Sequence, residues 1–216
     1  MRILKGLVLK SAISDDDIYR PKQSEAKNVG KLLKDTKITK KNYQHTYDLN
    51  IKEIGPVQLF KQGDKDGRGT HLYFVKDDLI IAWVHIHDNR VLGKPATEVK
   101  GILVHSSYQN KGLGYRIYCI LFSLYGNVLG DWGQFTNDRK IWVRLSNEGD
   151  VSIVNIQTNK ILEKNYKIED IYDSVVWDSR PSVDAEMAVR CLLTNINTDT
   201  LILKTHKKGQ RIGISK

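Results

Sequence analysis

Cysteine is scarce in this chain of 216 residues, which contains only Cys119 and Cys191. Two cysteines cannot build the framework of several disulfides that holds small secreted domains together, and their spacing fits no zinc motif. Both stand among apolar residues, so we interpret them as buried, reduced thiols. This usage is typical of a cytoplasmic protein, and a cytoplasmic location is expected.

Long apolar runs are also missing. No stretch of about 18 apolar residues occurs, so we expect neither a transmembrane helix nor a membrane partner. Near the N-terminus, Lys5 and Lys10 interrupt the apolar residues and no small-residue cleavage site follows, so no signal peptide is expected. With 40% hydrophobic and 27% charged residues, the chain has the composition of a globular protein that buries a sizeable core.

Acidic residues are missing from one end of the chain, and the net charge of +9 is concentrated at the two ends. Residues 1–50 hold 11 basic and 6 acidic side chains, and residues 201–216 hold 5 basic and no acidic ones. The basic segments 31–41 and 204–211 are therefore candidates to bind an acidic protein surface or a nucleic acid. The alternative is an ordinary solvated surface, and the oligomeric state is left open.

Hydrophobic patterning predicts a mixed α/β domain in which helices interrupt a largely antiparallel sheet. Helices are expected at residues 24–36, 115–126, 136–147 and 183–194, and strands at residues 1–10, 54–63, 71–75, 79–88, 97–107, 127–132, 150–157, 172–178 and 200–205. We divide the chain into a basic N-terminal region (1–50), a core (51–160) and a C-terminal extension with one helix, one strand and a basic tail (161–216). All three parts are expected to form one structural domain.

The most informative segment joins a predicted strand to a predicted helix. It reads Val104-His-Ser106-Ser-Tyr-Gln109-Asn-Lys-Gly112-Leu-Gly114. The two glycines let the backbone turn tightly and bring N–H groups close to a ligand. The helix that follows offers the unpaired N–H groups of its first turn and the positive end of its dipole, so the segment predicts a site for a pyrophosphate.

This segment resembles the hallmark V-x-P-x-x-(Q/R)-x-x-G-x-(G/A) of the GNAT superfamily of N-acetyltransferases, and only Ser106, at the proline position, departs from it. The resemblance covers about residues 72–154. It implies the GNAT-type acyl-CoA N-acyltransferase fold, a central mixed, mostly antiparallel sheet flanked by helices, here with N- and C-terminal additions. It also implies two strands that splay apart around residues 99–104 and 127–132, and acetyl-CoA as co-substrate without a metal.

The resemblance also assigns residues to acetyl-CoA. Main-chain N–H groups of the loop and of the start of the helix would bind the pyrophosphate, and the strand before the loop would meet the pantetheine arm. N–H groups near Val104 would polarise the thioester carbonyl. The residues expected to bind the co-substrate are Leu103, Val104, Gln109, Asn110, Lys111, Gly112, Leu113, Gly114, Tyr115 and Arg116.

Candidate catalytic residues follow from the same resemblance. Many GNAT proteins keep a glutamate general base eleven residues before the Gln/Arg of the loop, and Glu98 stands there. His105, which titrates near neutrality, is an alternative. Many also keep a tyrosine that protonates the departing thiolate, but Trp142 occupies the nearest place, and an indole N–H cannot supply a proton as a phenol does. Tyr118 or a water would then serve, the thiolate would leave unassisted, or no reaction would occur.

Residues 128–145 also resemble short GNAT-like proteins of bacteriophages and mobile elements. The leading prediction is an acetyl-CoA-dependent N-acetyltransferase that acts on an unknown amine by direct attack, in the host cytoplasm if the chain is phage-encoded. One alternative is a catalytically inactive GNAT-fold protein that has a structural role, for instance in a virion, or that binds a host protein. A second alternative is an acetyltransferase toxin directed at charged tRNA, which the basic ends favour.

A metal site is not expected from the sequence. His85 and His87 alternate along one predicted strand and so face the same side, but a site needs at least one further ligand, for which His71 is only a guess. Asp64-x-Asp66-Gly67 has the start of a calcium-loop pattern but lacks the later ligands, so we interpret it as a turn.

Overall fold

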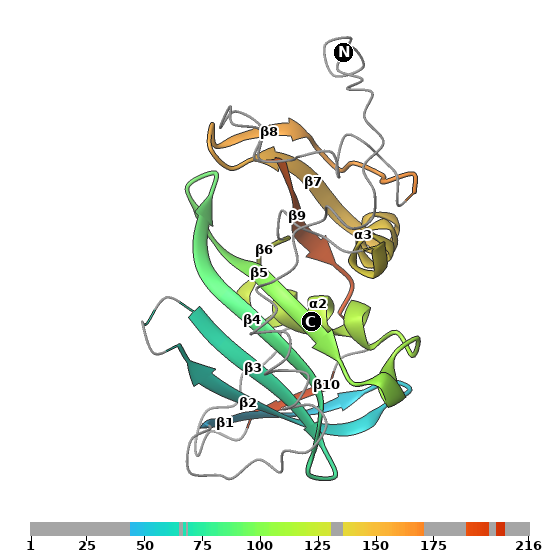
Figure 1. The fold of residues 1–216 in the computed structure, drawn as a ribbon. Coiled ribbons are helices and arrows are strands. Elements are labelled where there is room, and N and C mark those ends of the chain that lie inside the picture. The colour runs from blue at the N-terminus through green and yellow to red at the C-terminus, as the bar shows by residue number, and fades with distance from the viewer. Residues whose placement is uncertain are drawn as a thin grey trace.

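The computed structural model describes residues 44–64, 67, 69–130, 136–170, 189–198 and 202–205. Within them, ten strands form one sheet in the order β10-β1-β2-β3-β4-β5-β6-β9-β7-β8 (Figure 1). The strands are β1 (Gln44–Ile51), β2 (Gly55–Gly63), β3 (Gly69–Lys76), β4 (Leu79–Val91), β5 (Lys94–Val104), β6 (Val128–Leu129), β7 (Gly149–Asn155), β8 (Lys160–Glu163), β9 (Val189–Ile196) and β10 (Ile202–Thr205). The helices are the 3-10 helix η3 (Ser106–Tyr108), α2 (Leu113–Tyr125) and α3 (Thr136–Glu148).

The sheet is mixed and mostly antiparallel, as predicted. Its parallel pair is β5 with β6, joined at Thr97 opposite Val128 and at Glu98 opposite Leu129. Among the described residues β5 and β6 pair only at these two positions, so β5 continues beyond Glu98 without β6 beside it. This arrangement agrees with the expected splaying of the two strands and with the predicted acyltransferase-type fold.

Two tight hairpins account for the regular antiparallel half of the sheet. Asp77 and Asp78, between β3 and β4, have φ angles of 49° and 62°, and Leu92 and Gly93, between β4 and β5, have φ angles of 55° and 74°. Two consecutive positive φ angles are the geometry of the turn whose twist matches that of the strands it joins. The strands predicted at residues 71–75 and 79–88 are therefore confirmed as the antiparallel pair β3 and β4.

Alternate residues of β3 divide between two of the three apolar clusters of the described residues. Leu72 and Phe74 pack with α2 and α3 in the main core, whereas Tyr73 and Val75 belong to a second cluster together with Trp83. Successive strand residues point to opposite faces of a sheet, so the two helices cover one face and the second cluster lies on the other.

Helices α2 and α3 lie where the sequence predicts them and pack against each other. Gly114 makes this packing close, because a Cβ atom there would approach Ile141 Cδ1 to 2.7 Å. Cys119 of α2 and Cys191 of β9 are both buried and free, as expected. No helix in the described part of the chain is long and apolar enough to cross a membrane.

The predicted helix at 183–194 is wrong where the structure describes it. Residues 189–196 form strand β9, which lies between β6 and β7 inside the sheet. Four consecutive residues, 190–193, are buried, because an interior strand of this sheet is covered on both faces. Such a strand shows no alternation of apolar and polar residues, which made its apolar run resemble a helix. The described residues of the C-terminal extension thus contain most of β8 together with β9 and β10, and residues 189–194 of the predicted helix belong to β9.

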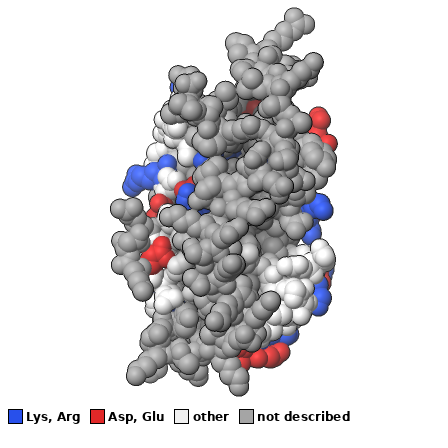
Figure 2. All heavy atoms as spheres, viewed as in Figure 1, with Lys and Arg blue, Asp and Glu red and all other residues white. Residues whose placement is uncertain are grey.

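Several other predictions lie outside the described residues. These are the strand at 1–10, the helix at 24–36, the strand at 172–178, the basic segment 31–41 and all but the first two residues of the segment 204–211. Where described side chains are visible in Figure 2, basic and acidic residues are interspersed rather than gathered in one patch. This distribution fits the nearly neutral balance of the central part of the sequence.

Candidate active site

The loop 105–112, between β5 and α2, is held by its own hydrogen bonds. The Nδ1 atom of His105 accepts a hydrogen bond from the main-chain N–H of Ser107 at 3.2 Å, and Tyr108 N donates to His105 O at 2.8 Å. Gln109 Nε2 donates to Val104 O at 3.0 Å. His105 thus caps the short 3-10 helix, a positioning role that the sequence did not predict.

Two residues with positive φ angles connect the end of the loop to α2. Asn110 has φ 58° and Gly112 has φ 73°, and Gly112 stands at the N-cap position of the helix. The left-handed region suits glycine and asparagine, so both residues fit their places. Leu113 is buried and fixes the helix start, while residues 109–112 are exposed. The loop therefore presents main-chain groups to solvent from a fixed backbone.

Positive charge surrounds this helix start. Lys111 Nζ lies 5.2 Å from the centre of the Tyr108 ring. Arg144 of α3 comes within 3.9 Å of the Cβ position at Gly112 and stacks on the Tyr115 ring at 3.9 Å. Arg144 is not predictable from the sequence, because its approach to the loop depends on how α3 packs against α2.

Glu148 connects Tyr115 and Arg144 by accepting a hydrogen bond from each. Tyr115 donates its hydroxyl proton to Glu148 Oε2 at 2.6 Å, and Arg144 Nε donates to Glu148 Oε1 at 2.7 Å. Burial opposes the charge of Glu148, but the hydrogen bonds from Tyr115 and Arg144 outweigh it and lower the pKa of this carboxyl. Burial, with the bond to Glu148, raises the pKa of Tyr115, so its hydroxyl stays a donor.

The Arg116 side chain, which is predicted to bind acetyl-CoA, points toward Glu53 instead. Its Nη2 lies 3.7 Å from Glu53 Oε2, in the turn between β1 and β2. Leu103 and Val104, which are predicted to contact acetyl-CoA, lie at the end of β5, and both side chains are half-buried. The structure thus brings residues 109–115 together at one helix start and orients the Arg116 side chain toward Glu53.

Glu98 is buried at the point where β6 leaves β5. Its side chain is 8% exposed, and its two oxygens accept hydrogen bonds from Lys100 Nζ at 2.7 Å and Asn89 Nδ2 at 3.1 Å. The register with β4 shifts here, because Ile86 pairs with Val99 and His85 with Gly101. Lys100 lies within this bulge, and its side chain reaches the Glu98 carboxylate. A buried carboxylate with two donors is well fixed in place.

Tyr118 and Trp142 lie together inside the core formed by α2 and α3. Their ring centres are 5.1 Å apart at an interplanar angle of 66°, and both residues are buried. Trp142 Nε1 has no hydrogen-bond partner among the described residues. The predicted proton donor Tyr118 therefore faces an aromatic neighbour, and the indole N–H of Trp142 is an unused donor.

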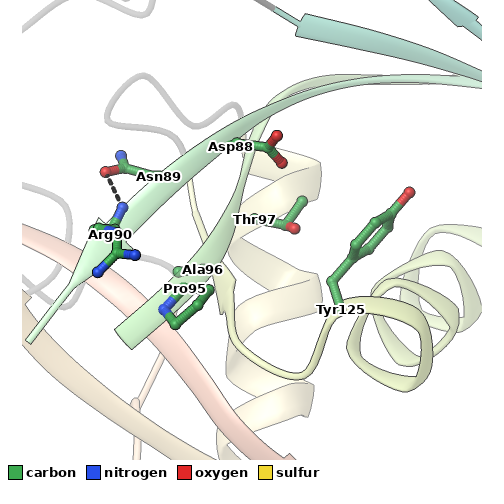
Figure 3. A pocket seen from close by; sticks show the side chains of 7 residues that line it. All are labelled: Asp88, Asn89, Arg90, Pro95, Ala96, Thr97 and Tyr125. Atoms are coloured by element: carbon green, nitrogen blue, oxygen red, sulfur yellow. Dashed lines mark hydrogen bonds between the residues drawn. The ribbon is translucent and has the colours of Figure 1, made fainter. Parts of the chain in front are cut away.

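A hollow of about 600 Å³ lies at the other end of α2 (Figure 3). Its wall consists of Asp88, Asn89, Arg90, Pro95, Ala96, Thr97 and Tyr125. Burial, with Tyr47 and Asp88 nearby, raises the pKa of Tyr125 to about 12. Because these residues come from the end of β4, the beginning of β5 and the end of α2, the hollow is separate from the loop 105–112.

Four polar side chains meet on the sheet face that carries the second apolar cluster. Asp64 lies at the end of β2, His71 in β3, and His85 and His87 in β4; we call these four residues the histidine cluster. Gly67 N donates to Asp64 O at 3.1 Å, as expected of the predicted turn. Burial and the neighbouring charges of His85 and Lys100 lower the pKa of His87. The sequence did not point to Asp64 as a partner of the histidines.

Comparison with known proteins finds a partial match to the predicted family. Residues 37–119 match the model described as the acetyltransferase (GNAT) family. The match includes β5, the loop 105–112 and the start of α2, and it confirms the predicted resemblance over this range. It supports acyl transfer in general and gives no support to an origin from bacteriophages or mobile elements.

Among solved structures, the acetoin utilization protein from Exiguobacterium sibiricum 255-15 is similar to this chain. The two are 14% identical, the match covers 72% of this chain and 87% of that one, and the TM-score is 0.34. No curated protein matches the chain.

Proposed function

We propose that this GNAT-type domain transfers the acetyl group of acetyl-CoA to an amine. The observation that carries the proposal is the loop 105–112, which offers exposed main chain at the start of α2. N–H groups of the first helical turn would bind the pyrophosphate, because they lack partners within the helix and lie at the positive end of its dipole. Lys111 and Arg144 would add positive charge beside them.

The pantetheine arm would run from the loop along β5 toward Glu98. Beyond Glu98 the edge of β5 has no pairing with β6 among the described residues, so its main-chain groups suit an extended ligand. The thioester would then lie near the point where the strands separate. Holding amine and thioester together there would supply much of the rate.

Glu98 would act as the general base. Lys100 Nζ and Asn89 Nδ2 hold its two oxygens in place at the point where the strands separate. The amine nitrogen would form a bond to the acetyl carbonyl carbon, the amine proton would pass to Glu98, and the carbon–sulfur bond would break to release the CoA thiolate. Tyr118 stays a predicted proton donor for that thiolate, and the indole of Trp142 would offer a hydrogen bond without giving up its proton.

Calorimetric titration with CoA tests the proposed pyrophosphate site at the loop 105–112 and the start of α2. Wild-type protein should bind CoA, and Lys111→Glu should weaken binding about tenfold, since it replaces a favourable charge with a repulsive one. Lys160→Glu, an identical charge change at an exposed position of β8, should leave the affinity unchanged. Absence of binding at millimolar CoA contradicts the proposed pyrophosphate site. An equal loss of CoA affinity in both variants contradicts it as well.

Turnover tests the reaction separately. Incubation with acetyl-CoA and a panel of primary amines should release free CoA thiol. Tight CoA binding without turnover on any amine would favour the catalytically inactive alternative. The observation that favours that alternative is Trp142, buried where the family keeps a reactive phenol.

A further inference from the structure

Three side chains of the histidine cluster place nitrogen and oxygen atoms around one point. Asp64 Oδ2 lies 2.9 Å from His85 Nε2 and 3.9 Å from His87 Nε2, and the two Nε2 atoms are 3.2 Å apart. All three side chains are largely shielded, with exposed fractions of 15%, 23% and 29%. Strand β4 and the residue that follows β2 thus bring three ligand-type atoms together, although Asp64 is 21 residues from His85 in the sequence.

These separations match those between ligands of one metal ion. Two ligands at about 2.0–2.1 Å from a tetrahedral ion lie about 3.3 Å apart, and the three observed separations fall on both sides of that value. We propose that Asp64, His85 and His87 bind a divalent transition-metal ion of the zinc class. Two imidazoles and one carboxylate suit such an ion better than calcium, which takes oxygen ligands.

His71 would position the carboxylate rather than bind the ion. Trp83 Nε1 donates to His71 Nδ1 at 3.1 Å, so the His71 proton resides on Nε2 in the neutral ring. That atom lies 2.5 Å from Asp64 Oδ1 and donates to it, which leaves Oδ2 for the metal. Metal-binding carboxylates are commonly oriented by such a second hydrogen bond.

Gly69 leaves the room that the ion needs. It pairs with His87 across β3 and β4. A Cβ atom there would lie 2.3 Å from Asp64 Oδ2, 2.6 Å from His85 Nε2 and 2.7 Å from His87 Cδ2. A methyl group would therefore occupy the space between the three ligands, which only glycine keeps free.

Three protein ligands leave at least one coordination position open. Partial exposure of the three side chains allows a water to take it, as in zinc sites with three protein ligands. The same face carries Glu98, since His87 and Glu98 pair across β4 and β5. The metal site stands on its own geometry and does not depend on acyl transfer.

Zinc titration of the untagged full-length chain, stripped with a chelator, tests this proposal. Wild-type protein should bind one Zn²⁺ per chain, and Co²⁺ should give the visible absorption of a four- or five-coordinate site. His85→Gln and Asp64→Asn should each weaken Zn²⁺ binding at least about tenfold, because each removes one metal bond. His45→Gln should keep the wild-type affinity, because His45 pairs with Asp48 outside the cluster.

A glycine pair provides a test that removes no ligand. Gly69→Ala should also weaken Zn²⁺ binding at least about tenfold, since its methyl group displaces the ligands. Gly63→Ala, at a β2 position with nothing within 4 Å of the new atom, should leave binding unchanged. Far-ultraviolet circular dichroism must show that each variant is folded.

Binding also has a stability readout. Saturating Zn²⁺ should raise the melting temperature of wild type, Gly63→Ala and His45→Gln, and it should raise that of Asp64→Asn by less. Absence of 1:1 binding to folded wild type, or an affinity unchanged in Asp64→Asn and His85→Gln, overturns the proposal. Loss of CoA binding with intact Zn²⁺ binding would instead count only against the proposed acyl transfer.

Discussion

The loop 105–112 and the histidine cluster hold their polar groups in opposite ways. The loop presents main-chain groups of consecutive residues, and its backbone is shaped by the positive φ angles of Asn110 and Gly112. The cluster presents side chains from β3, β4 and the residue that follows β2, and the strand register brings them together. We therefore expect the loop to be sensitive to backbone changes, and the cluster to single side-chain changes.

Glu98 lies between the two regions and gives the largest expected effect. It lies in β5, which leads into the loop, and it pairs with His87 of the cluster. Glu98→Gln should lower turnover about 100-fold, because an amide cannot accept the amine proton. CoA affinity, measured by calorimetry, should stay unchanged, since the loop keeps its backbone.

The matched control is Glu163→Gln, which removes a carboxylate from β8 at the far edge of the sheet. It should keep wild-type turnover. Full activity in folded Glu98→Gln would remove Glu98 as the base. A loss of CoA affinity would show that the two ends of β5 are coupled.

Local features of the fold were predictable from the sequence. Helices α2 and α3 show apolar residues at helical spacing, and the two-residue turn Asp77-Asp78 separates two apolar runs. The predicted loop likewise depends on residues that are neighbours in the chain. In each case the decisive interactions act over a few residues, so the pattern itself contains them.

Features that depend on register were not predictable. Asp64 approaches His85 only because β2, β3 and β4 pair in one particular alignment, and Arg144 approaches Gly112 only because α3 packs on α2. Strand β9 gave a wrong prediction because an interior strand hides its period of two. Residue spacing along the chain carries none of this information.

Trp83→Phe gives the next largest effect and concerns the cluster. It keeps an aromatic ring beside His71 and removes the N–H that His71 Nδ1 accepts. Zn²⁺ affinity should fall about tenfold, because Asp64 loses the partner that orients it. Trp142→Phe is the matched control, since Trp142 Nε1 has no partner in the described part of the chain. Equal affinities in the two variants would contradict the positioning role of His71.

The smallest expected effect concerns the support behind the loop. Glu148 and Arg144 have side chains 44% and 47% exposed, so Glu148→Gln should lower the free energy of unfolding at pH 7 by less than about 1 kcal/mol. The folded-state pKa of Glu148 is lowered from its ordinary value of 4.5, so near and below that value the unfolded chain binds more protons than the folded one.

The stability contributed by the Glu148 carboxylate is therefore fully present above about pH 5 and is lost as the pH falls through the lowered pKa. Urea unfolding of wild type and Glu148→Gln should give a difference at pH 7 that shrinks steadily in acid. Zn²⁺ affinity should not change, because Glu148 lies on α3 and the cluster on the face away from it. A stability difference that stays constant from pH 7 into acid would mean that the carboxylate charge contributes nothing, and that the loop is supported by packing alone.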